Sequence, residues 1–141
     1  MKKILLASSL VCFALASCNN SDTNSQNFAK SPEELKIELI QHEKNDPTNY
    51  LFADGTYREN IWGNKLKVSC TITNNATLTT YKDVVVRVNY YSQTESVLAT
   101  NEYTIYEYFQ PNSSKTIEMK IENYSDVYTI GWDVVSALAV N

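Results

Sequence analysis

The side chains most often used in catalysis or metal binding are scarce in this chain. It contains one histidine, His42, and three cysteines, of which only Cys70 lies beyond the N-terminal region. Zinc sites take about four Cys, His or carboxylate ligands, and nucleophilic triads need a histidine beside the nucleophile. His42 lies next to Glu43 in a charged segment, and we interpret it as a solvated side chain. Cys70 falls among alternating apolar residues, which predicts a buried, inert thiol.

Carboxylates are the remaining groups that could catalyse a reaction, because a pair of them can hydrolyse glycosidic bonds. The acidic turn at 123–126 lacks EF-hand spacing, so we favour solvated turn residues over a Ca²⁺ site. We predict no catalytic residue, no metal and no cofactor, and we keep a small carboxylate-dependent hydrolase as an alternative. The carboxylates considered lie at expected strand ends or on polar faces, without a periodicity that selects a pair: Asp83, Glu102, Glu107 and Asp133.

The residues before Cys18 form a pattern that is typical of exported proteins. The chain begins with MKK, continues with an apolar stretch too short for a comfortable bilayer span, and reads LASC over Leu15–Cys18. A basic head before a short apolar core is typical of a secretory signal peptide. The LASC stretch resembles the lipobox of bacterial lipoproteins. That resemblance implies a signal peptide over residues 1–17, and Cys18 as the first mature residue, carrying acyl chains that attach it to a membrane.

Residues 18–30 are rich in Asn, Ser, Thr and Gln and nearly free of large apolar side chains. Such a segment buries too little surface to offset its ordering entropy, so we predict a flexible tether. The expected location is a bacterial cell envelope, as an outer-membrane lipoprotein. Asp22, shortly after Cys18, does not decide between the periplasmic and the cell-surface side.

The bulk composition restricts the partners of the chain. It has 141 residues and a formal net charge of −4, which becomes more negative by two if Lys2 and Lys3 leave with a signal peptide. An acidic domain is a poor candidate for binding nucleic acid or anionic lipid headgroups. With one cysteine in the signal and one acylated, Cys70 has no intrachain disulfide partner. The remaining length suits one domain, residues 31–141.

That domain is predicted to start with a helix. Ser31 can cap it, Pro32 suits its first turn, and Asn45 to Pro47 stop it. Leu35 and Leu39 fall on one face, and we expect them to pack on the rest of the domain, because so short a helix is marginal alone.

The sequence changes to a period of two from Tyr50 onward, which indicates strands. Apolar side chains alternate with polar ones, and the longest candidate strand is 97–109. Together the alternation and the absence of further helices predict a mainly β fold: an antiparallel β-sandwich of about seven strands with one N-terminal helix. The alternating stretches are 66–73, 84–91, 115–121 and 130–140, separated by turn-type residues at 54–55, 63–64, 74–75, 111–113 and 123–126.

Residues 66–121 resemble the FxLYD-type domains of secreted and membrane-tethered bacterial proteins. The matching motifs are TITN over Thr71–Asn74, the strand Val84–Tyr91, and a Pro-containing strand entry over Gln110–Ile117, where Asn112 replaces the usual Gly. Of the stretch that names the family, Val88–Ser92 keeps only Tyr91. The resemblance implies an immunoglobulin-like sandwich and no known catalytic centre.

Tyrosine is abundant, with ten residues, and there are two tryptophans. We expect Trp132, in an apolar row, to belong to the core. Alternation directs Tyr81, Tyr91, Tyr106 and Tyr108 away from the core, and exposed aromatics are typical of binding surfaces. We favour the interpretation that the helix and the N-terminal segment cover them; if they are uncovered, the candidate binding residues are Tyr91, Tyr106, Tyr108 and Trp62.

The first functional hypothesis is a lipid-tethered, non-catalytic envelope protein that binds another envelope protein or a glycan, and does not bind nucleic acid. A structural or assembly accessory of an envelope complex is the second, and the small hydrolase named above is the third. The sequence does not name a ligand.

Overall fold

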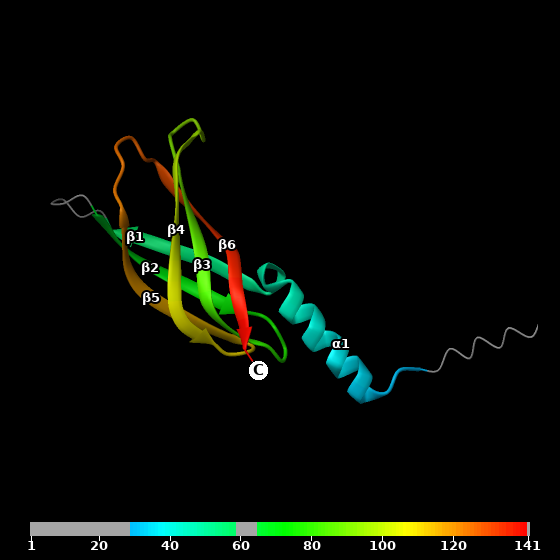
Figure 1. The fold of residues 1–141 in the computed structure, drawn as a ribbon. Helices are drawn as coiled ribbons and strands as arrows, with labels where there is room; N and C mark the ends of the chain where they lie inside the picture. The colour runs from blue at the N-terminus through cyan, green and yellow to red at the C-terminus, as the bar shows by residue number, and fades with distance from the viewer. Residues whose placement is uncertain (1–28, 59–64, 141) are drawn as a thin grey trace, which may run out of the picture.

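The computed structural model describes residues 29–58 and 65–140, and its fold is the predicted mainly β sandwich (Figure 1). Six strands lie in these ranges, where about seven were expected. The elements are α1 (Pro32–Asn45), the short 3-10 helix η1 (Pro47–Asn49), β1 (Leu51–Arg58), β2 (Lys65–Asn74), β3 (Thr80–Tyr91), β4 (Val97–Phe109), β5 (Ser113–Glu122) and β6 (Thr129–Val140).

The strands form two antiparallel sheets of three. Sheet A has the order β1-β2-β5, and sheet B has the order β4-β3-β6. In sheet A, Leu51 pairs with Asn74 and Cys70 pairs with Ile117. In sheet B, the central strand β3 pairs with β4 on one side and β6 on the other.

The core lies between the sheets and is made by the alternation that the sequence shows. One cluster of buried side chains includes Cys70, Ile72, Val84 and Phe109. A second cluster includes Leu66, Val68, Val88, Tyr90 and Ile121. Fully burying such a side chain contributes about 1.5–3 kcal/mol. Trp132 packs against both clusters, in agreement with its predicted place in the core.

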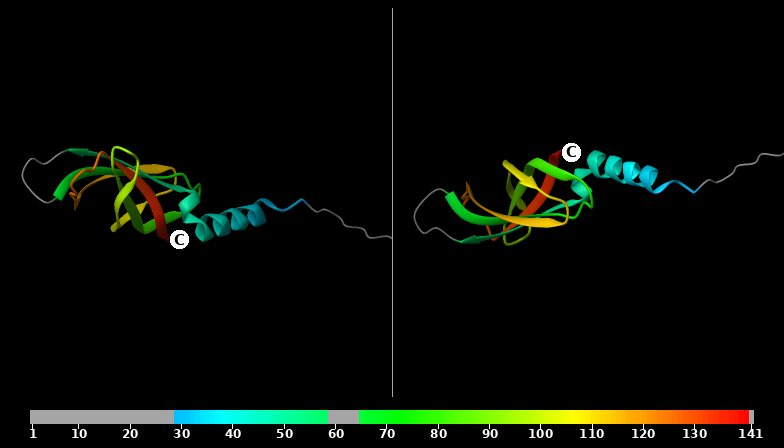
Figure 2. Two further views of the ribbon diagram at one scale, coloured as in Figure 1. Left: turned by 90° about the horizontal axis from the view of Figure 1, so that it is seen from above. Right: turned by 90° about the horizontal axis from the view of Figure 1, so that it is seen from below.

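The sandwich has two distinct ends. At one end, which we call the anchored end because α1 is attached to the sandwich there, β1 begins and β2 ends. The loop at 75–79 and the turn at 110–112 lie at the same end. At the opposite, distal end lie the hairpin at 92–96 and the loop at 123–128. Figure 2 shows α1 extending away from the sandwich at the anchored end, on the side remote from the distal end.

Helix α1 forms where it was predicted, for the predicted reasons. The Ser31 hydroxyl accepts a hydrogen bond from the Glu34 backbone N–H at 3.2 Å, and the Glu34 carboxylate accepts one from the Ser31 N–H at 2.8 Å. This capping box satisfies two of the donors that a helix start leaves free. The hydrogen bonds to Ser31 also lower the pKa of the Glu34 carboxyl.

The expected packing of α1 is wrong. Leu35 and Leu39 do not cover the sandwich: 54% of Leu35 and 36% of Leu39 are exposed. The helix points outward, so only its last turns reach the strands (Figure 2). The fully buried residue of α1 is a charged one, Glu43.

Glu43 joins the helix to the loop before β3. One carboxylate oxygen accepts from the Thr77 N–H at 2.6 Å, and the other accepts from the N–H groups of Leu78 at 3.1 Å and Thr79 at 2.8 Å. The Tyr81 hydroxyl donates to the Glu43 carbonyl at 2.5 Å. Burial alone would raise the pKa of Glu43, but the hydrogen bonds from this loop outweigh it and lower the pKa. We call these contacts the Glu43 clamp.

Asn74 is a second buried polar group at the anchored end. Its amide nitrogen donates to the carbonyls of Thr79 at 3.0 Å and Phe109 at 2.9 Å, and its amide oxygen accepts from the Ala76 N–H at 2.9 Å. One side chain therefore ties the end of β2 to the chain before β3 and to the end of β4. A buried amide is stable only when its polar atoms are bonded in this way.

The pair Asp54-Gly55 was predicted to be a turn, and it lies inside β1 instead. Its glycine is needed for packing rather than for turning. A Cβ at Gly55 would lie 2.4 Å from Cε2 of Trp132, because the indole of β6 packs directly over the β1 backbone. The Asp54 carboxylate accepts from the Gly55 N–H at 2.8 Å.

The alternation in β3 does not run through the whole strand. Tyr81, predicted to face away from the core, is fully buried. The register with β4 and with β6 shifts after Lys82, where Asp83 adopts a left-handed backbone with φ of 50°. The alternation breaks at this irregularity, so Tyr81 and Val84 both face the core although they are three residues apart. Burial, followed by the Glu43 charge, raises the pKa of Tyr81 to about 12.

None of the helices in 29–58 and 65–140 has both the length and the apolar character that crossing a membrane requires.

Candidate functional site

Two of the predicted aromatic residues form one exposed surface on the outer face of sheet B. Tyr106 is 79% exposed and Tyr108 is 57% exposed, and both project from the same side of β4. Lys82 pairs with Tyr108 on one side and with Leu138 on the other, which places Leu138, 55% exposed, two strands from Tyr108. We call Tyr106, Tyr108 and Leu138 the tyrosine surface. The expectation that the N-terminal helix covers these tyrosines is wrong, because α1 points away from the sandwich.

The tyrosine surface borders an unused strand edge. Strand β4 lies at the edge of sheet B, and within the described residues it pairs only with β3. Its links to sheet A are side-chain contacts: Glu107 accepts from Lys115 at 2.6 Å, and the Tyr103 hydroxyl accepts from the Glu122 N–H at 3.1 Å. An edge strand presents free backbone N–H and C=O groups to a potential partner.

Three of the four carboxylates considered for catalysis are engaged by different partners, and Glu102 and Asp133 lie on either side of Arg87, on β4 and β6. Arg87 donates to Glu102 at 2.9 Å, Lys115 pairs with Glu107, and the Asn89 amide donates to Asp133 at 2.8 Å. The fourth, Asp83, lies at the irregular point of β3.

Tyr91 lies at the other end of β3 from the tyrosine surface. It is nine residues from Lys82 along the strand, which corresponds to about 30 Å at about 3.3 Å per residue. Tyr91 is half-buried, and its ring lies close to Gly131 of β6. Trp62, the fourth predicted binding residue, lies outside the described residues, as does Cys18. The structure therefore brings Tyr106 and Tyr108 together and separates both from Tyr91.

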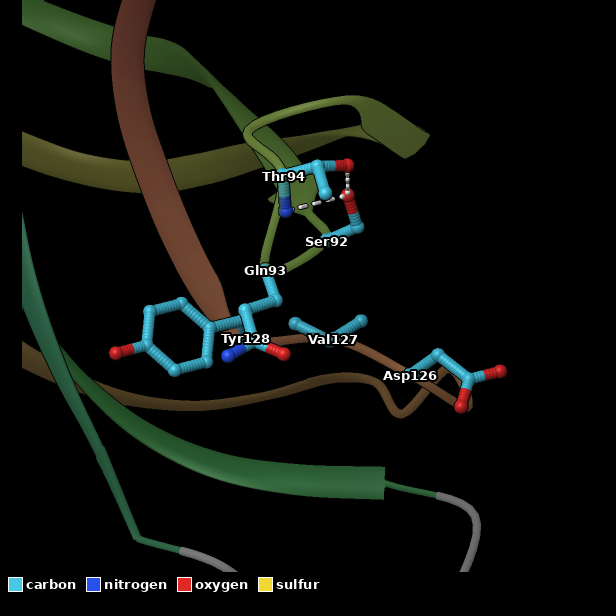
Figure 3. Close-up of a pocket in the computed structure, with 6 residues that line it drawn as sticks. All are labelled: Ser92, Gln93, Thr94, Asp126, Val127 and Tyr128. Atoms are coloured by element: carbon cyan, nitrogen blue, oxygen red, sulfur yellow. Dashed lines mark hydrogen bonds between the residues drawn. The ribbon is translucent and has the colours of Figure 1, made fainter.

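The distal end carries a cleft that sequence reasoning did not single out. Its open volume is about 390 Å³, and Figure 3 shows it between the hairpin at 92–96 and the loop at 126–128. We call it the distal cleft. The lining residues are Ser92, Gln93, Thr94, Asp126, Val127 and Tyr128. The loop overlaps the predicted turn at 123–126, but no turn was predicted at 92–96, and nothing in one sequence indicates that these two segments face each other.

Hydrogen bonds hold both walls of the distal cleft. The Ser92 hydroxyl accepts from the N–H groups of Thr94 at 3.3 Å and Ser96 at 3.2 Å, which closes the hairpin. On the other wall, the Tyr128 N–H donates to the Tyr91 carbonyl at 2.7 Å, and the Tyr57 hydroxyl donates to the Tyr128 carbonyl at 3.4 Å. Both walls continue directly from paired strands.

The remaining candidate groups have simple environments. Cys70 is fully buried, as predicted, and burial raises the pKa of its thiol to about 11, so the thiolate is scarce at neutral pH. His42 is exposed on α1. In the part of the chain that the structure describes, no group of three His, Cys, Asp or Glu side chains is placed to hold a metal ion.

Comparison of the chain with protein-family models, with curated proteins and with solved structures finds no match.

Proposed function

We propose that this protein is a lipid-anchored, non-catalytic component of a bacterial cell envelope that binds another envelope protein through the tyrosine surface. Membrane attachment is inferred from the resemblance of Leu15–Cys18 to a lipobox. In this proposal residues 1–17 are removed, Cys18 is acylated, and the protein is held in the outer membrane. The immunoglobulin-like, FxLYD-type identity of the sandwich is part of the same proposal.

The exposure of Tyr106 and Tyr108 is the observation that supports binding most directly. Tyrosine combines a large apolar ring with a polar tip and is enriched at protein interfaces. Here two rings project beside a strand edge that has no further strand paired to it among residues 29–58 and 65–140, so a partner segment can bond the edge of β4 and pack against the rings at the same time. Shallow, exposed surfaces of this kind suit a protein partner better than a small molecule.

A site-specific photocrosslink tests the binding surface. A photoreactive amino acid replaces Tyr106 in one variant and Phe52 in a matched control, because Phe52 is also an exposed aromatic but lies on the outer face of sheet A. We expect one discrete crosslinked envelope protein from position 106 and none from position 52. Equal crosslinking from both positions would contradict the proposal.

Substitution then measures how much the tyrosines contribute. We expect Tyr106→Ala combined with Tyr108→Ala to weaken capture of the crosslinked partner by at least about tenfold, since buried interface tyrosines commonly contribute more than about 1 kcal/mol each. Phe52→Ala should leave capture unchanged. Retention of full affinity by the double variant would exclude the tyrosine surface as the binding site.

Anchoring is tested separately. Cys18→Ala should move the protein from the membrane fraction to the soluble fraction, and mass spectrometry of the purified wild type should find acyl chains on Cys18. An unmodified Cys18 thiol with the leader still present would refute the lipoprotein assignment. It would not affect the test of the tyrosine surface.

A further inference from the structure

The distal cleft has the dimensions of a small-ligand site. Its volume of about 390 Å³ lies in the lower part of the range of roughly 300–1,000 Å³ that is usual for such sites. Its lining residues come from the hairpin between β3 and β4 and from the loop before β6. Figure 1 shows both segments at the end of the sandwich opposite α1, so a bound molecule would not meet the helix.

The lining residues exclude most ligand classes. Apolar ligands need a mainly apolar lining, whereas this cleft offers two hydroxyls, an amide and a carboxylate beside Val127 and Tyr128. Anionic ligands need basic partners, and none of the described lining residues is basic. A tightly held cation needs several oxygen ligands with charge, and Asp126 is the single carboxylate among the lining residues that the structure describes. A neutral ligand that carries many hydroxyl groups fits this mixture of an amide, a carboxylate and an exposed ring.

The side chains are arranged as such a ligand requires. Tyr128 is 66% exposed, so one face of its ring is free to stack on the C–H face of a sugar. In Figure 3 the Tyr128 ring and the Asp126 carboxylate lie at opposite ends of the lower wall. The hydroxyls of Ser92 and Thr94 bond each other at 3.0 Å, which leaves the Gln93 amide and the Asp126 carboxylate as the groups available to sugar hydroxyls.

The walls are also ordered before any ligand arrives. The Ser92 hydrogen bonds close one wall, and the Tyr128 backbone is bonded on both its N–H and C=O sides. A preformed site loses less conformational entropy on binding than a flexible loop does.

We propose that the distal cleft binds a neutral oligosaccharide, with Tyr128 stacking on a sugar ring and Gln93 and Asp126 hydrogen-bonding its hydroxyls. This site uses residues different from those of the tyrosine surface, so the sugar-binding proposal is tested independently of the proposed protein partner.

The test is a titration of the purified full-length protein with cellotetraose, maltotetraose and chitotetraose, followed by backbone amide NMR shifts. Tetragalacturonate serves as an anionic comparison. We expect at least one neutral tetrasaccharide to shift the amides of 92–94 and 126–128, with a Kd on the order of 1 mM, because the cleft is open and buries only part of a ligand.

Three variants assign the roles. Tyr128→Ala should weaken binding by about tenfold, the usual contribution of an aromatic contact. Asp126→Asn should weaken it several-fold, and asparagine tolerates the positive φ of 64° at this position, so the backbone is preserved. Phe52→Ala, an exposed aromatic at the other end of the sandwich, should bind like the wild type.

The outcomes are decisive in both directions. Shifts confined to the two walls, with an affinity that falls by about tenfold in Tyr128→Ala, establish the site. The absence of shifts with all the neutral sugars at about 10 mM, equal affinity in Tyr128→Ala, or tighter binding of tetragalacturonate would each overturn the proposal.

Discussion

The two ends of the sandwich use polar residues in opposite ways. At the anchored end, Glu43 and Asn74 are fully buried, and their polar atoms are bonded to backbone groups of neighbouring loops. At the distal end, Asp126 and Gln93 are exposed beside the ring of Tyr128. A buried polar group that is fully bonded fixes one conformation, whereas an exposed one remains available to a ligand. The comparison assigns stability to the buried polar groups of one end and sugar recognition to the exposed polar groups of the other.

The largest expected effect comes from removing the Glu43 clamp. Glu43→Ala leaves the N–H groups of Thr77, Leu78 and Thr79 without their acceptor, and we expect the free energy of unfolding to fall by about 3–5 kcal/mol. Urea denaturation followed by circular dichroism measures the loss. Glu38→Ala, an exposed carboxylate on the same helix, is the control and should change stability by less than about 0.5 kcal/mol. A loss of similar size in both variants would contradict the difference drawn between buried and exposed carboxylates.

Asn74→Ala should have the next largest effect. It removes three hydrogen bonds and leaves two buried carbonyls unsatisfied, so we expect a loss of about 2–3 kcal/mol in the same denaturation experiment. Asn75→Ala changes a neighbouring exposed side chain and should be nearly neutral. If Asn75→Ala destabilises as much as Asn74→Ala, the effect belongs to the loop and not to the buried amide.

Acid should weaken the anchored end of the sandwich. The pKa of Glu43 is lowered in the folded protein, so its contribution is complete above the unfolded value of about 4.3 and is lost as the pH falls below that through the folded value. The urea midpoint of the wild type should therefore decline below about pH 4 more steeply than that of Glu43→Gln. Parallel profiles for the two proteins would show that Glu43 is not the responsible carboxyl.

The smallest effects on stability should come from the recognition surfaces. Tyr106→Ala and Tyr128→Ala remove exposed rings, 79% and 66% accessible, and each should change the free energy of unfolding by less than about 0.5 kcal/mol. Thermal unfolding measures this directly. A loss above about 2 kcal/mol at either position would mean that the tyrosine is structural, and the corresponding binding proposal would lose its basis.

Local chemistry in the sequence predicted much of the fold. The cap of α1 by Ser31 and the period-two strands were readable because each depends on residues a few positions apart. Asn112, the substitute for glycine after Pro111, does take a left-handed backbone with φ of 51°.

What the sequence could not predict depends on distant contacts. Tyr81 faces the core because of an irregularity at Asp83 that leaves no periodic signal. Gly55 resembles a turn residue, yet its role is to admit Trp132 from a strand more than 70 residues away. The distal cleft requires two turns to face each other, and the buried carboxylate of Glu43 reads in sequence as one more charge on a solvated helix.

The outward direction of α1 has a mechanical consequence. The helix has 14 residues and is about 21 Å long, and it meets the sandwich through its last turns. Because α1 is continuous with η1 and β1, a pull on the chain ahead of Pro32 is transmitted through the helix to the Glu43 clamp and the start of β1. The exposed turns of α1 lie ahead of the clamp, so they can uncoil and lengthen this connection without breaking the contacts of Glu43.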